Sequence, residues 1–441
     1  MDINRKTAYD ILLDIEKNDS YSNIATNAFI KKNSPDKESF VREIVYGVLK
    51  NKILLDYYLD KLIKNGTRKT KKQDLTLLRM GLYQIIYMDS VPEYAAVNET
   101  VNMAKSLARG RERFINGVLR GFLKNRERLE LPGAASAEAA DAEPSGNPAK
   151  YLAIRYSISE WIVKLWLETY GFEKTERILA SANETPKLAI RANWLKIDTD
   201  SLQERLESQG FKVDAEYKTD RGLLVSGSRL LETEEYKQGL FSVQDVASIM
   251  ASDLTMAEPG DLVIDVCAAP GGKSLATAEL MKNEGEIIAC DIYEHKLELI
   301  EKQAQRLGVN IIKTRRHDST ELMTEFVGRA DRVICDVPCS GLGVIARKPE
   351  IKYKQEYTGL DDLAELIEIQ ARILSNASKY VKPGGKLVYS TCTIDKHENE
   401  EQIERFLQEN EEFSLEKELQ LFPFDGTDGF FICRMARTMI Y

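Results

Sequence analysis

Apolar residues recur at three- and four-residue steps over most of residues 1–130, and this spacing predicts amphipathic helices. The faces include the sets Ala8, Ile11, Leu12, Ile15; Phe40, Ile44, Val48; Leu75, Leu78, Leu82, Ile85, Ile86; and Val97, Val101, Ala104, Leu107. Gly66 and Pro92 fall between periodic stretches and predict breaks. We therefore expect residues 1–130 to form an all-α bundle of six or seven short helices.

The pattern stops at residues 131–150, LPGAASAEAADAEPSGNPAK, which combine Ala, Pro, Gly, Ser and acids without an apolar face. Such a composition predicts a flexible linker. The pattern over residues 151–255 is mixed. It predicts a helix around 161–170, strands near 188–193, 211–216 and 223–226, and a helix opened by a capping box from Ser201 to Glu204. We expect a small α/β subdomain there.

From residue 256 to 441, short apolar runs alternate with helical periods. The runs lie at 262–266, 287–290, 311–313, 333–335 and 387–389, with helical patterns such as 294–307 and 361–380 between them. Strands that alternate with helices pair in parallel, so this region predicts a Rossmann-like, doubly wound α/β domain.

Bulk composition fits a globular protein of two or three domains. The chain has 441 residues, of which 43% are hydrophobic and 30% charged. No run approaches the roughly 18 apolar residues that span a membrane, and the first residues lack the apolar core of a signal peptide. We expect a cytoplasmic protein without a membrane partner.

The net charge of −9 is unevenly distributed. Residues 1–130 carry 24 Lys and Arg against 17 Asp and Glu, whereas the remainder carries 37 against 53. A basic head on an acidic body is compatible with local RNA binding. The candidate contacts are residues 64–72, KNGTRKTKK, and the arginines Arg109, Arg111, Arg113, Arg120, Arg126 and Arg128.

A glycine-rich turn follows the first predicted strand of the last domain, in DVCAAPGGKS at residues 265–274. Glycines let the backbone approach a ligand, and the next helix offers free N–H groups. Acids recur at later strand ends: Asp291, Asp318 and Asp336. Carboxylates suit a cationic adenosyl cofactor that lacks phosphates. The expected cofactor residues are Cys267, Ala268, Ala269, Pro270, Gly271, Gly272, Lys273, Asp291, Asp318 and Asp336.

Two cysteines fall on the edge of the predicted sheet where ligands bind. Cys339 lies in DVPCSG at residues 336–341, and Cys392 in STCT at residues 390–393. A free thiol is intrinsically nucleophilic. We interpret the other four cysteines as buried small apolar residues: Cys267, Cys290, Cys335 and Cys433. No pair has CxxC spacing, so we expect no metal site.

Taken together, DVCAAPGGKS, DVPCSG and YSTCT resemble the cytosine-5 RNA methyltransferases of the Nop2/Sun/Fmu family. FSVQDVASIM at 241–250 and RAN at 191–193 match the same pattern. VREIVYGVLK, LRMGLYQIIYM, VPEYAAVNETVNMAK and FINGVLRGFLK resemble the NusB-type helical domain fused to the RsmB (Sun) branch, which acts on 16S ribosomal RNA. The resemblance covers nearly the whole chain outside residues 131–150.

The resemblance implies S-adenosylmethionine as cofactor and 16S ribosomal RNA as substrate, bound before or early in subunit assembly by a monomer. It implies that Cys392 attacks carbon 6 of cytosine and that Cys339 assists proton removal and release. Asp336 would bond to the N3/N4 edge of the base, and Lys273 would orient cofactor or base. Asp291 would hold the ribose hydroxyls of the cofactor and Asp318 its adenine side.

Three other functions remain open at this point. A DNA cytosine-5 methyltransferase would use the Pro-Cys cysteine as nucleophile, and the second cysteine in STCT disfavours it. A transfer-RNA methyltransferase of the same family shares the catalytic motifs, and only the NusB-like head points to ribosomal RNA. A non-enzymatic RNA-binding factor fits the head alone but leaves the cysteine pair unexplained.

Overall fold

The computed structural model describes residues 2–18, 20–129, 131, 147–215, 218–227, 229–353 and 359–439. The chain divides into two compact units. Unit 1 is Met1–Glu184 with Ile345–Gly359, and unit 2 is Thr185–Val344 with Leu360–Tyr441. Residues 132–146, most of the predicted linker at 131–150, lie outside the described residues.

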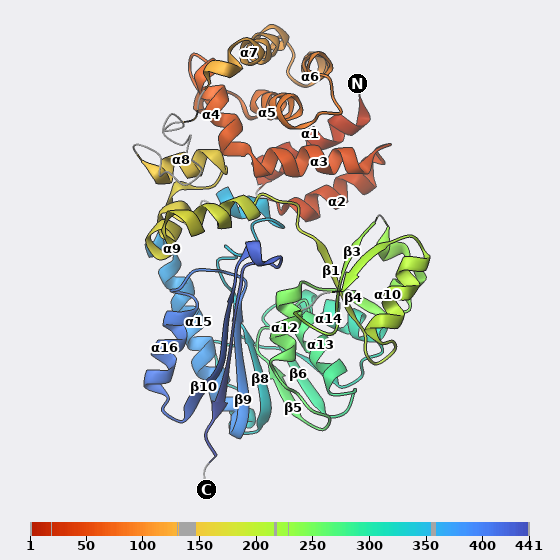
Figure 1. The fold of residues 1–441 in the computed structure, drawn as a ribbon, viewed down its shortest axis with the longest axis vertical. Coiled ribbons are helices and arrows are strands. Elements are labelled where there is room, and N and C mark those ends of the chain that lie inside the picture. The colour runs from red at the N-terminus through yellow and green to blue at the C-terminus, as the bar shows by residue number, and fades with distance from the viewer. Residues whose placement is uncertain are drawn as a thin grey trace. The chain divides into compact units, whose positions relative to one another are not determined.

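Unit 1 is helical, as the periodicity predicts (Figure 1). Its helices are α1 (Ile3–Asn18), α2 (Ser22–Asn33), α3 (Glu38–Lys50), α4 (Lys52–Leu62), α5 (Lys72–Tyr87), α6 (Glu93–Leu107), α7 (Glu112–Asn125), α8 (Pro148–Arg155) and α9 (Glu160–Ser181), with the short 3-10 turns η1 (Thr67–Lys69), η2 (Arg126–Arg128) and η6 (Pro349–Tyr353). Every residue of α5 from Asp74 to Gln84 is buried, so α5 forms the centre of the bundle. The other helices pack their apolar faces around it.

The helical unit is larger than the predicted bundle of residues 1–130. Helix α8 packs against α4, and η6 packs against α3. The predicted subdomain of 151–255 is therefore divided, because α8 and α9 belong to unit 1. The periodicity of a helix shows that it has an apolar face but not which partner covers that face.

The first sheet of unit 2 is antiparallel, with the strand order β2-β3-β1-β4. The antiparallel module built on this sheet comprises β1 (Leu188–Ala192), α10 (Thr199–Ser208), β2 (Lys212–Ala215), β3 (Gly222–Ser226), η4 (Leu230–Glu232), α11 (Glu234–Lys237) and β4 (Phe241–Val243). Helix α12 (Val246–Asp253) follows it. The predicted capping box is wrong. Helix α10 begins at Thr199, and its N-cap is Asp198, whose carboxylate accepts from Ser201 N.

The second sheet has seven strands in the order β10-β11-β9-β8-β5-β6-β7. Its elements are β5 (Leu262–Asp265), α13 (Gly272–Leu280), β6 (Glu286–Asp291), α14 (Glu294–Leu307), β7 (Ile312–Arg316), η5 (Thr324–Phe326), β8 (Ala330–Asp336), α15 (Leu360–Tyr380), β9 (Val381–Thr391), α16 (Glu400–Glu409), β10 (Phe413–Leu421), η7 (Pro423–Asp425) and β11 (Phe430–Arg437). The five strands β5 to β9 are parallel, which confirms the Rossmann-like prediction. The antiparallel strands β10 and β11, which the periodicity did not reveal, extend the sheet beyond β9 (Figure 1).

Candidate active site

The carboxyl ends of β5, β6, β8 and β9 meet at one edge of the seven-stranded sheet. In a parallel sheet, ligands bind outside this edge. The glycine-rich turn follows β5, Asp291 ends β6, Asp336 ends β8 and the STCT run ends β9. The fold thus brings the three sequence motifs to the same edge of unit 2.

The turn after β5 requires glycine. Gly271 has φ +100°, a conformation that other residues rarely adopt, and a Cβ there would lie 3.1 Å from Ile300 Cγ1. Gly272 begins α13, so free N–H groups of that helix face the turn. These N–H groups can serve as hydrogen-bond donors to a ligand.

Acids surround this turn. Asp291 is buried, and its Oδ1 accepts from Tyr293 N at 3.0 Å. Hydrogen bonds from the Thr320 side chain and backbone hold the pKa of Asp318 below its ordinary value, so Asp318 remains an anion. Such carboxylate acceptors fit the ribose hydroxyls and the cationic group of S-adenosylmethionine.

Asp265, at the end of β5, is an acid of this site that the sequence analysis did not single out. Burial raises its pKa to about 7. Its Oδ2 accepts from Ser274 Oγ, whereas Oδ1 has no hydrogen-bond partner among the described residues. A buried carboxyl oxygen without a partner is costly, and a polar ligand in the turn would relieve it.

Asp336 and Lys273 form an ion pair on the same edge. Lys273 Nζ lies 2.7 Å from Asp336 Oδ2, and Ser390 Oγ donates to Asp336 Oδ1 at 2.6 Å. The Lys273 ammonium also lies 5.1 Å from the centre of the Phe430 ring. These contacts fix both groups next to the two cysteine loops.

The two predicted cysteines are neighbours. Cys339 Sγ lies 3.1 Å from Cys392 Sγ, and Cys392 N donates to Cys339 Sγ at 3.3 Å. The hydrogen bond to Cys392, together with burial, raises the pKa of Cys339 well above its ordinary value. The raised pKa favours the protonated thiol form of Cys339. Of the remaining cysteines, Cys290, Cys335 and Cys433 are buried, as expected, whereas Cys267 is only partly buried, because it lies in the turn after β5.

Two adjacent residues before α16 hold the two cysteine loops, and sequence reasoning missed both. Glu398 accepts from Ser340 N at 2.9 Å, from Ser340 Oγ and from Gln370 Nε2 at 2.8 Å. Asn399 accepts from Thr391 Oγ1 and donates to the carbonyl oxygen of Thr393 at 3.1 Å. Glu398 thus fixes the residue after Cys339, and Asn399 fixes the residues on either side of Cys392.

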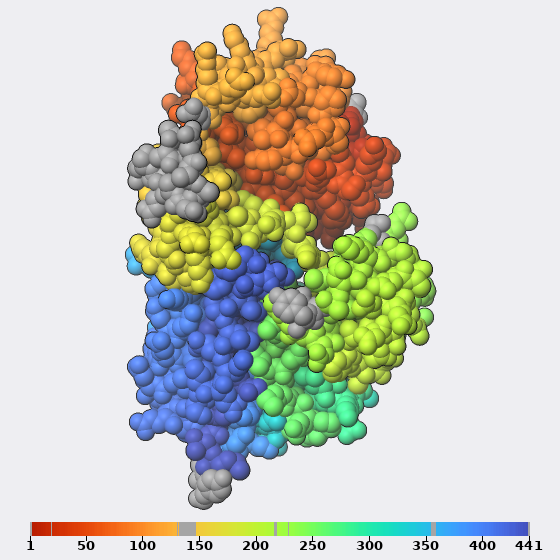
Figure 2. All heavy atoms as spheres, viewed as in Figure 1, coloured from red at the N-terminus to blue at the C-terminus, as the bar shows by residue number. Residues whose placement is uncertain are grey.

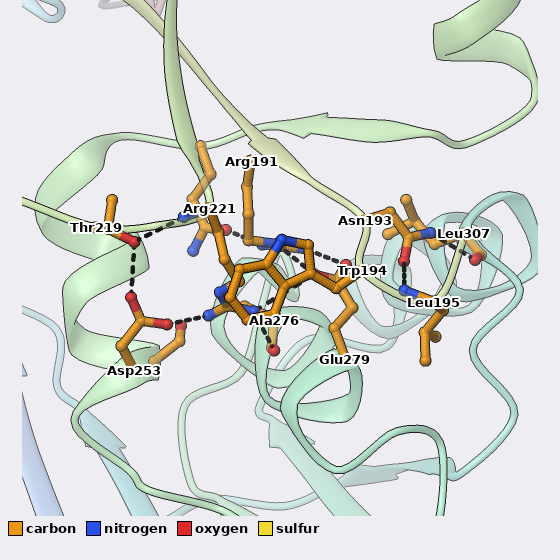
Figure 3. A network of polar contacts seen from close by, with 12 residues as sticks. Arg191, Asn193, Trp194, Leu195, Thr219, Arg221, Asp253, Ala276, Glu279 and Leu307 are labelled. Carbon is orange, nitrogen blue, oxygen red and sulfur yellow. Dashed lines mark hydrogen bonds and ion pairs between the residues drawn. The ribbon is translucent and has the colours of Figure 1, made fainter. Parts of the chain in front are cut away.

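A buried network connects the antiparallel sheet to the cofactor turn (Figure 3). Arg191 of β1 binds both carboxylate oxygens of Glu279 in α13, at 2.9 and 2.7 Å, and donates to the carbonyl oxygen of Gly272 at 3.2 Å. Arg221, the residue before β3, pairs with Asp253 and approaches Glu279. One arginine therefore contacts both ends of the helix that follows the cofactor turn.

Asn193, two residues after Arg191, performs the equivalent task for α14. Its Nδ2 donates to the carbonyl oxygens of Leu307, the last residue of α14, and of Gly239, both at 2.8 Å (Figure 3). Helices α13 and α14 follow the two strands that carry the turn and Asp291. The RAN run noted in the sequence therefore supports both walls of the cofactor site.

Comparisons with known proteins agree with this geometry. Three family models match the chain: the NusB family over residues 2–124, the ferredoxin-like domain of RsmF/B-like methyltransferases over residues 158–230, and the 16S rRNA methyltransferase RsmB/F over residues 254–436. A probable ribosomal RNA small subunit methyltransferase B from Bacillus subtilis is 38% identical, with 98% of each chain covered. The chain belongs to the RsmB/F 16S rRNA methyltransferases.

Solved structures support the fold of this family. A methyltransferase homologue from Pyrococcus horikoshii is 27% identical, with a TM-score of 0.60 over 66% of this chain and 99% of that one. The crystal structure of PH0851 has a TM-score of 0.78 and is 24% identical to this chain, with 97% of this chain and 98% of that one covered. At this identity the likeness shows the fold alone.

Membership of the RsmB/F family establishes an S-adenosylmethionine-dependent RNA methyltransferase with 16S ribosomal RNA as its substrate class. The family resemblance, the fold class and the cofactor that we predicted from the sequence are thus confirmed. Among the described residues, no helix has the length and apolar character needed to cross a membrane.

Proposed function

We propose that the chain methylates carbon 5 of a cytosine in 16S ribosomal RNA through a covalent adduct with Cys392. The observation that carries this proposal is the 3.1 Å separation of the Cys339 and Cys392 sulfur atoms beside Asp336 and Lys273. A mechanism with a single nucleophile would require only one thiol in the site. Two thiols in contact suit a reaction in which one attacks and the other acts after methyl transfer.

The chemistry requires such a nucleophile, because carbon 5 of cytosine is unreactive until a group adds to carbon 6. Cys392 supplies the attacking sulfur, and Cys339, whose pKa is raised by its hydrogen bond to Cys392 and by burial, stays beside it as a thiol. Asp336, held by Lys273 and Ser390, faces the N3/N4 edge of the base and stabilises the adduct. Bound S-adenosylmethionine supplies the methyl group on its sulfonium.

Release of the product completes the cycle. After methylation the proton on carbon 5 must leave, and the bond between carbon 6 and the Cys392 sulfur then breaks. Solvent water takes that proton, the electrons of the carbon–hydrogen bond form the double bond between carbons 5 and 6, and Cys392 leaves as a thiolate. Cys339 lies in contact with that sulfur, where its S–H stabilises the departing thiolate and so assists proton removal. The cytosine must first leave its stack at a cost of a few kcal/mol, which favours an unpaired position.

We also propose that residues Cys267 to Lys273 line the cofactor-binding site. Asp291 binds its ribose hydroxyls, and Asp318 lies on its adenine side. The rigid support of α13 and α14 by Arg191 and Asn193 favours such a preformed site.

Tritium release tests the position of methylation directly. 16S RNA transcribed with cytidine tritiated at carbon 5 is incubated with the full chain and S-adenosylmethionine. Methylation at carbon 5 expels one tritium for each methyl group transferred. Methyl transfer without tritium release would place the methyl group on another atom and overturn the proposal, whereas RNA incubated without S-adenosylmethionine gives the background.

A further inference from the structure

A groove of about 340 Å³ runs between the end of α4 and one face of α7 in unit 1. Leu62 and Phe114 form an apolar floor, and Lys64 and Arg113 stand at its rim. The volume falls within the range of small-molecule sites, about 300–1,000 Å³. Nothing in the chemistry of the methyltransferase site uses this groove.

Glycines keep the groove open. Gly117 and Gly121 lie one helical turn apart on the same face of α7, although glycine disfavours a helix interior. A Cβ on Gly117 would meet nothing within 4 Å, and one on Gly121 would lie 3.7 Å from Leu62 Cδ2. Packing inside unit 1 therefore does not demand glycine at either position, and a larger side chain would fill the groove.

The cations at the rim are available to a ligand. Lys64 and Arg113 are exposed, and neither forms an ion pair among the described residues. By contrast, Arg111 pairs with Asp74 and Arg126 with Glu93, although sequence analysis grouped these arginines with Arg113. No carboxylate lines the groove in the part of the chain that is described.

More positive charge continues along the same helix face. Arg120 and Lys124 follow Arg113 by seven and eleven residues, and both are exposed. The side chains of this region, light orange in Figure 2, project from the surface of unit 1. A line of cations beside an apolar slot matches a polyanion that carries planar, apolar-faced bases.

We propose that this groove seats one unpaired nucleotide of the ribosomal RNA substrate, with its base against Leu62 and Phe114 and its flanking phosphates on Lys64 and Arg113. The proposal rests on RNA being the substrate and is independent of which base atom is methylated. The cations along Arg120 and Lys124 extend the path of the RNA backbone beyond the groove. Unit 1 thereby contributes to binding of the substrate.

The test measures equilibrium binding of the full chain to a 16S RNA transcript by filter retention at several salt concentrations, without S-adenosylmethionine. Lys64→Gln combined with Arg113→Gln should weaken binding roughly tenfold and lower the slope of log affinity against log salt by about 2, one for each cation. The matched control, Lys31→Gln with Lys32→Gln, removes two exposed charges from α2 of the same unit and should leave both values near those of the unaltered chain.

A second pair of variants tests the groove without changing charge. Gly117→Leu keeps the helix and fills the groove, so it should weaken RNA binding while the salt slope is unchanged. Gly117→Ala improves helix propensity, leaves the groove open and should bind as the unaltered chain does.

Three results would overturn the proposal. Equal losses in the α2 control would mean diffuse attraction by charge. Unchanged binding of Gly117→Leu beside a loss in the charge variant would mean a backbone contact with no seated base. Unchanged binding in every variant would mean that the groove does not bind RNA and would favour a protein partner as its occupant. Because catalysis is not part of the measurement, a methyl group found on another base atom would not affect these outcomes.

Discussion

The sulfur atoms of Cys339 and Cys392 lie 3.1 Å apart, although the residues belong to loops separated by more than fifty positions in the chain. The distance is well above the roughly 2.05 Å of a disulfide, so the two residues are reduced and their sulfur atoms are in contact. Ser340 and Thr393, the residues that follow the two cysteines, also contact each other through their hydroxyl oxygens at 2.9 Å. The two loops are therefore joined at two successive positions.

Glu398→Ala should lower the rate of methyl transfer by releasing the Cys339 loop. The substitution leaves the buried Ser340 N without an acceptor, at about 1–3 kcal/mol, and removes one of the two acceptors of Gln370 Nε2, which still donates to the Pro338 carbonyl oxygen. We expect a lower kcat with an unchanged KM for S-adenosylmethionine, and faster alkylation of Cys339. Glu398→Gln, which keeps one acceptor oxygen, should recover part of the rate.

Glu404→Ala is the control for this prediction, because Glu404 is exposed on α16, the helix that follows Glu398. A purely global effect would lower the rate and the affinity for the cofactor together. That result would show that Glu398 stabilises the fold without positioning the cysteines.

Arg191→Met should weaken binding of S-adenosylmethionine although Arg191 is remote from the sulfur pair. It removes the donor to the Gly272 carbonyl and leaves Glu279 with only the more distant Arg221. Breaking a buried ion pair costs about 3–5 kcal/mol, and we expect at least tenfold weaker cofactor binding by calorimetry. Arg191→Lys should recover little, because lysine cannot bind both oxygens of Glu279 and Gly272 together.

The control here is Arg205→Met on α10, an exposed arginine of the same antiparallel module. Cofactor affinity equal to that of the unaltered chain in Arg191→Met would mean that the turn is rigid without the network.

The elevated pKa of Asp265 predicts a pH dependence of stability. The folded chain holds this proton up to about pH 7, whereas the unfolded chain loses it near the ordinary pKa of 3.8. Between these values the folded state binds more protons, so the free energy of unfolding falls as pH rises, by roughly 4 kcal/mol at most. Asp265→Asn removes this dependence and should make the cofactor-free chain more stable than the unaltered chain at pH 8 but not at pH 4.

Denaturant unfolding at a series of pH values provides the measurement, with the exposed Asp214→Asn as control. Parallel pH profiles for the unaltered chain and Asp265→Asn would show that Asp265 is ionised in the folded protein.

Tyr353→Phe should destabilise unit 1. The Tyr353 hydroxyl is buried, donates to the Leu49 carbonyl and accepts from Lys52 N at 3.2 Å. Its removal leaves a buried carbonyl and N–H unsatisfied, at about 1–3 kcal/mol for each group. Thermal unfolding checks this, with Tyr21→Phe, an exposed tyrosine of the same unit, as control. An unchanged melting temperature would mean that water replaces the hydroxyl.

The parts of the site carried by contiguous runs could be predicted from the sequence. The turn after β5 and the cysteines at the ends of β8 and β9 follow from strand alternation, because parallel strands place their carboxyl ends at one edge. Glu398 and Asn399 could not be predicted. The run HENEEQ is polar and resembles a solvated helix start, whereas both side chains are fully buried by packing against distant loops.

Tertiary packing also determines parts of the fold that the local sequence pattern does not predict. Lys352 lies in a polar segment, yet its Nζ is buried against the carbonyl oxygens of Lys50 and Tyr156 at 3.0 Å, and burial lowers its pKa to about 7. Nothing in the local pattern marks residues 345–359 as part of the helical unit. The motif Arg-Ala-Asn was visible, but its partners Glu279 and Leu307 lie in helices far along the chain.

The last prediction separates the roles of the two cysteines. Attack on carbon 6 comes first, so Cys392→Ala should abolish methyl transfer and form no covalent complex with RNA. Release comes last, so Cys339→Ala should still attack and then stall. Its adduct with 16S RNA should survive denaturing electrophoresis, and it should accumulate only when S-adenosylmethionine is present if methylation precedes the stall.

The geometry sharpens this expectation. Cys339→Ala also removes the neighbour that shares a proton with Cys392, so the thiolate of Cys392 loses a donor and the first attack should slow. Single-turnover kinetics would therefore show a slower burst followed by no second turnover. Cys339→Ser, which keeps a donor, should restore the burst and still accumulate adduct. An adduct trapped by Cys392→Ala instead would assign the attack to Cys339, as in the arrangement where the Pro-Cys residue is the nucleophile. Full activity in both alanine variants would exclude a covalent mechanism.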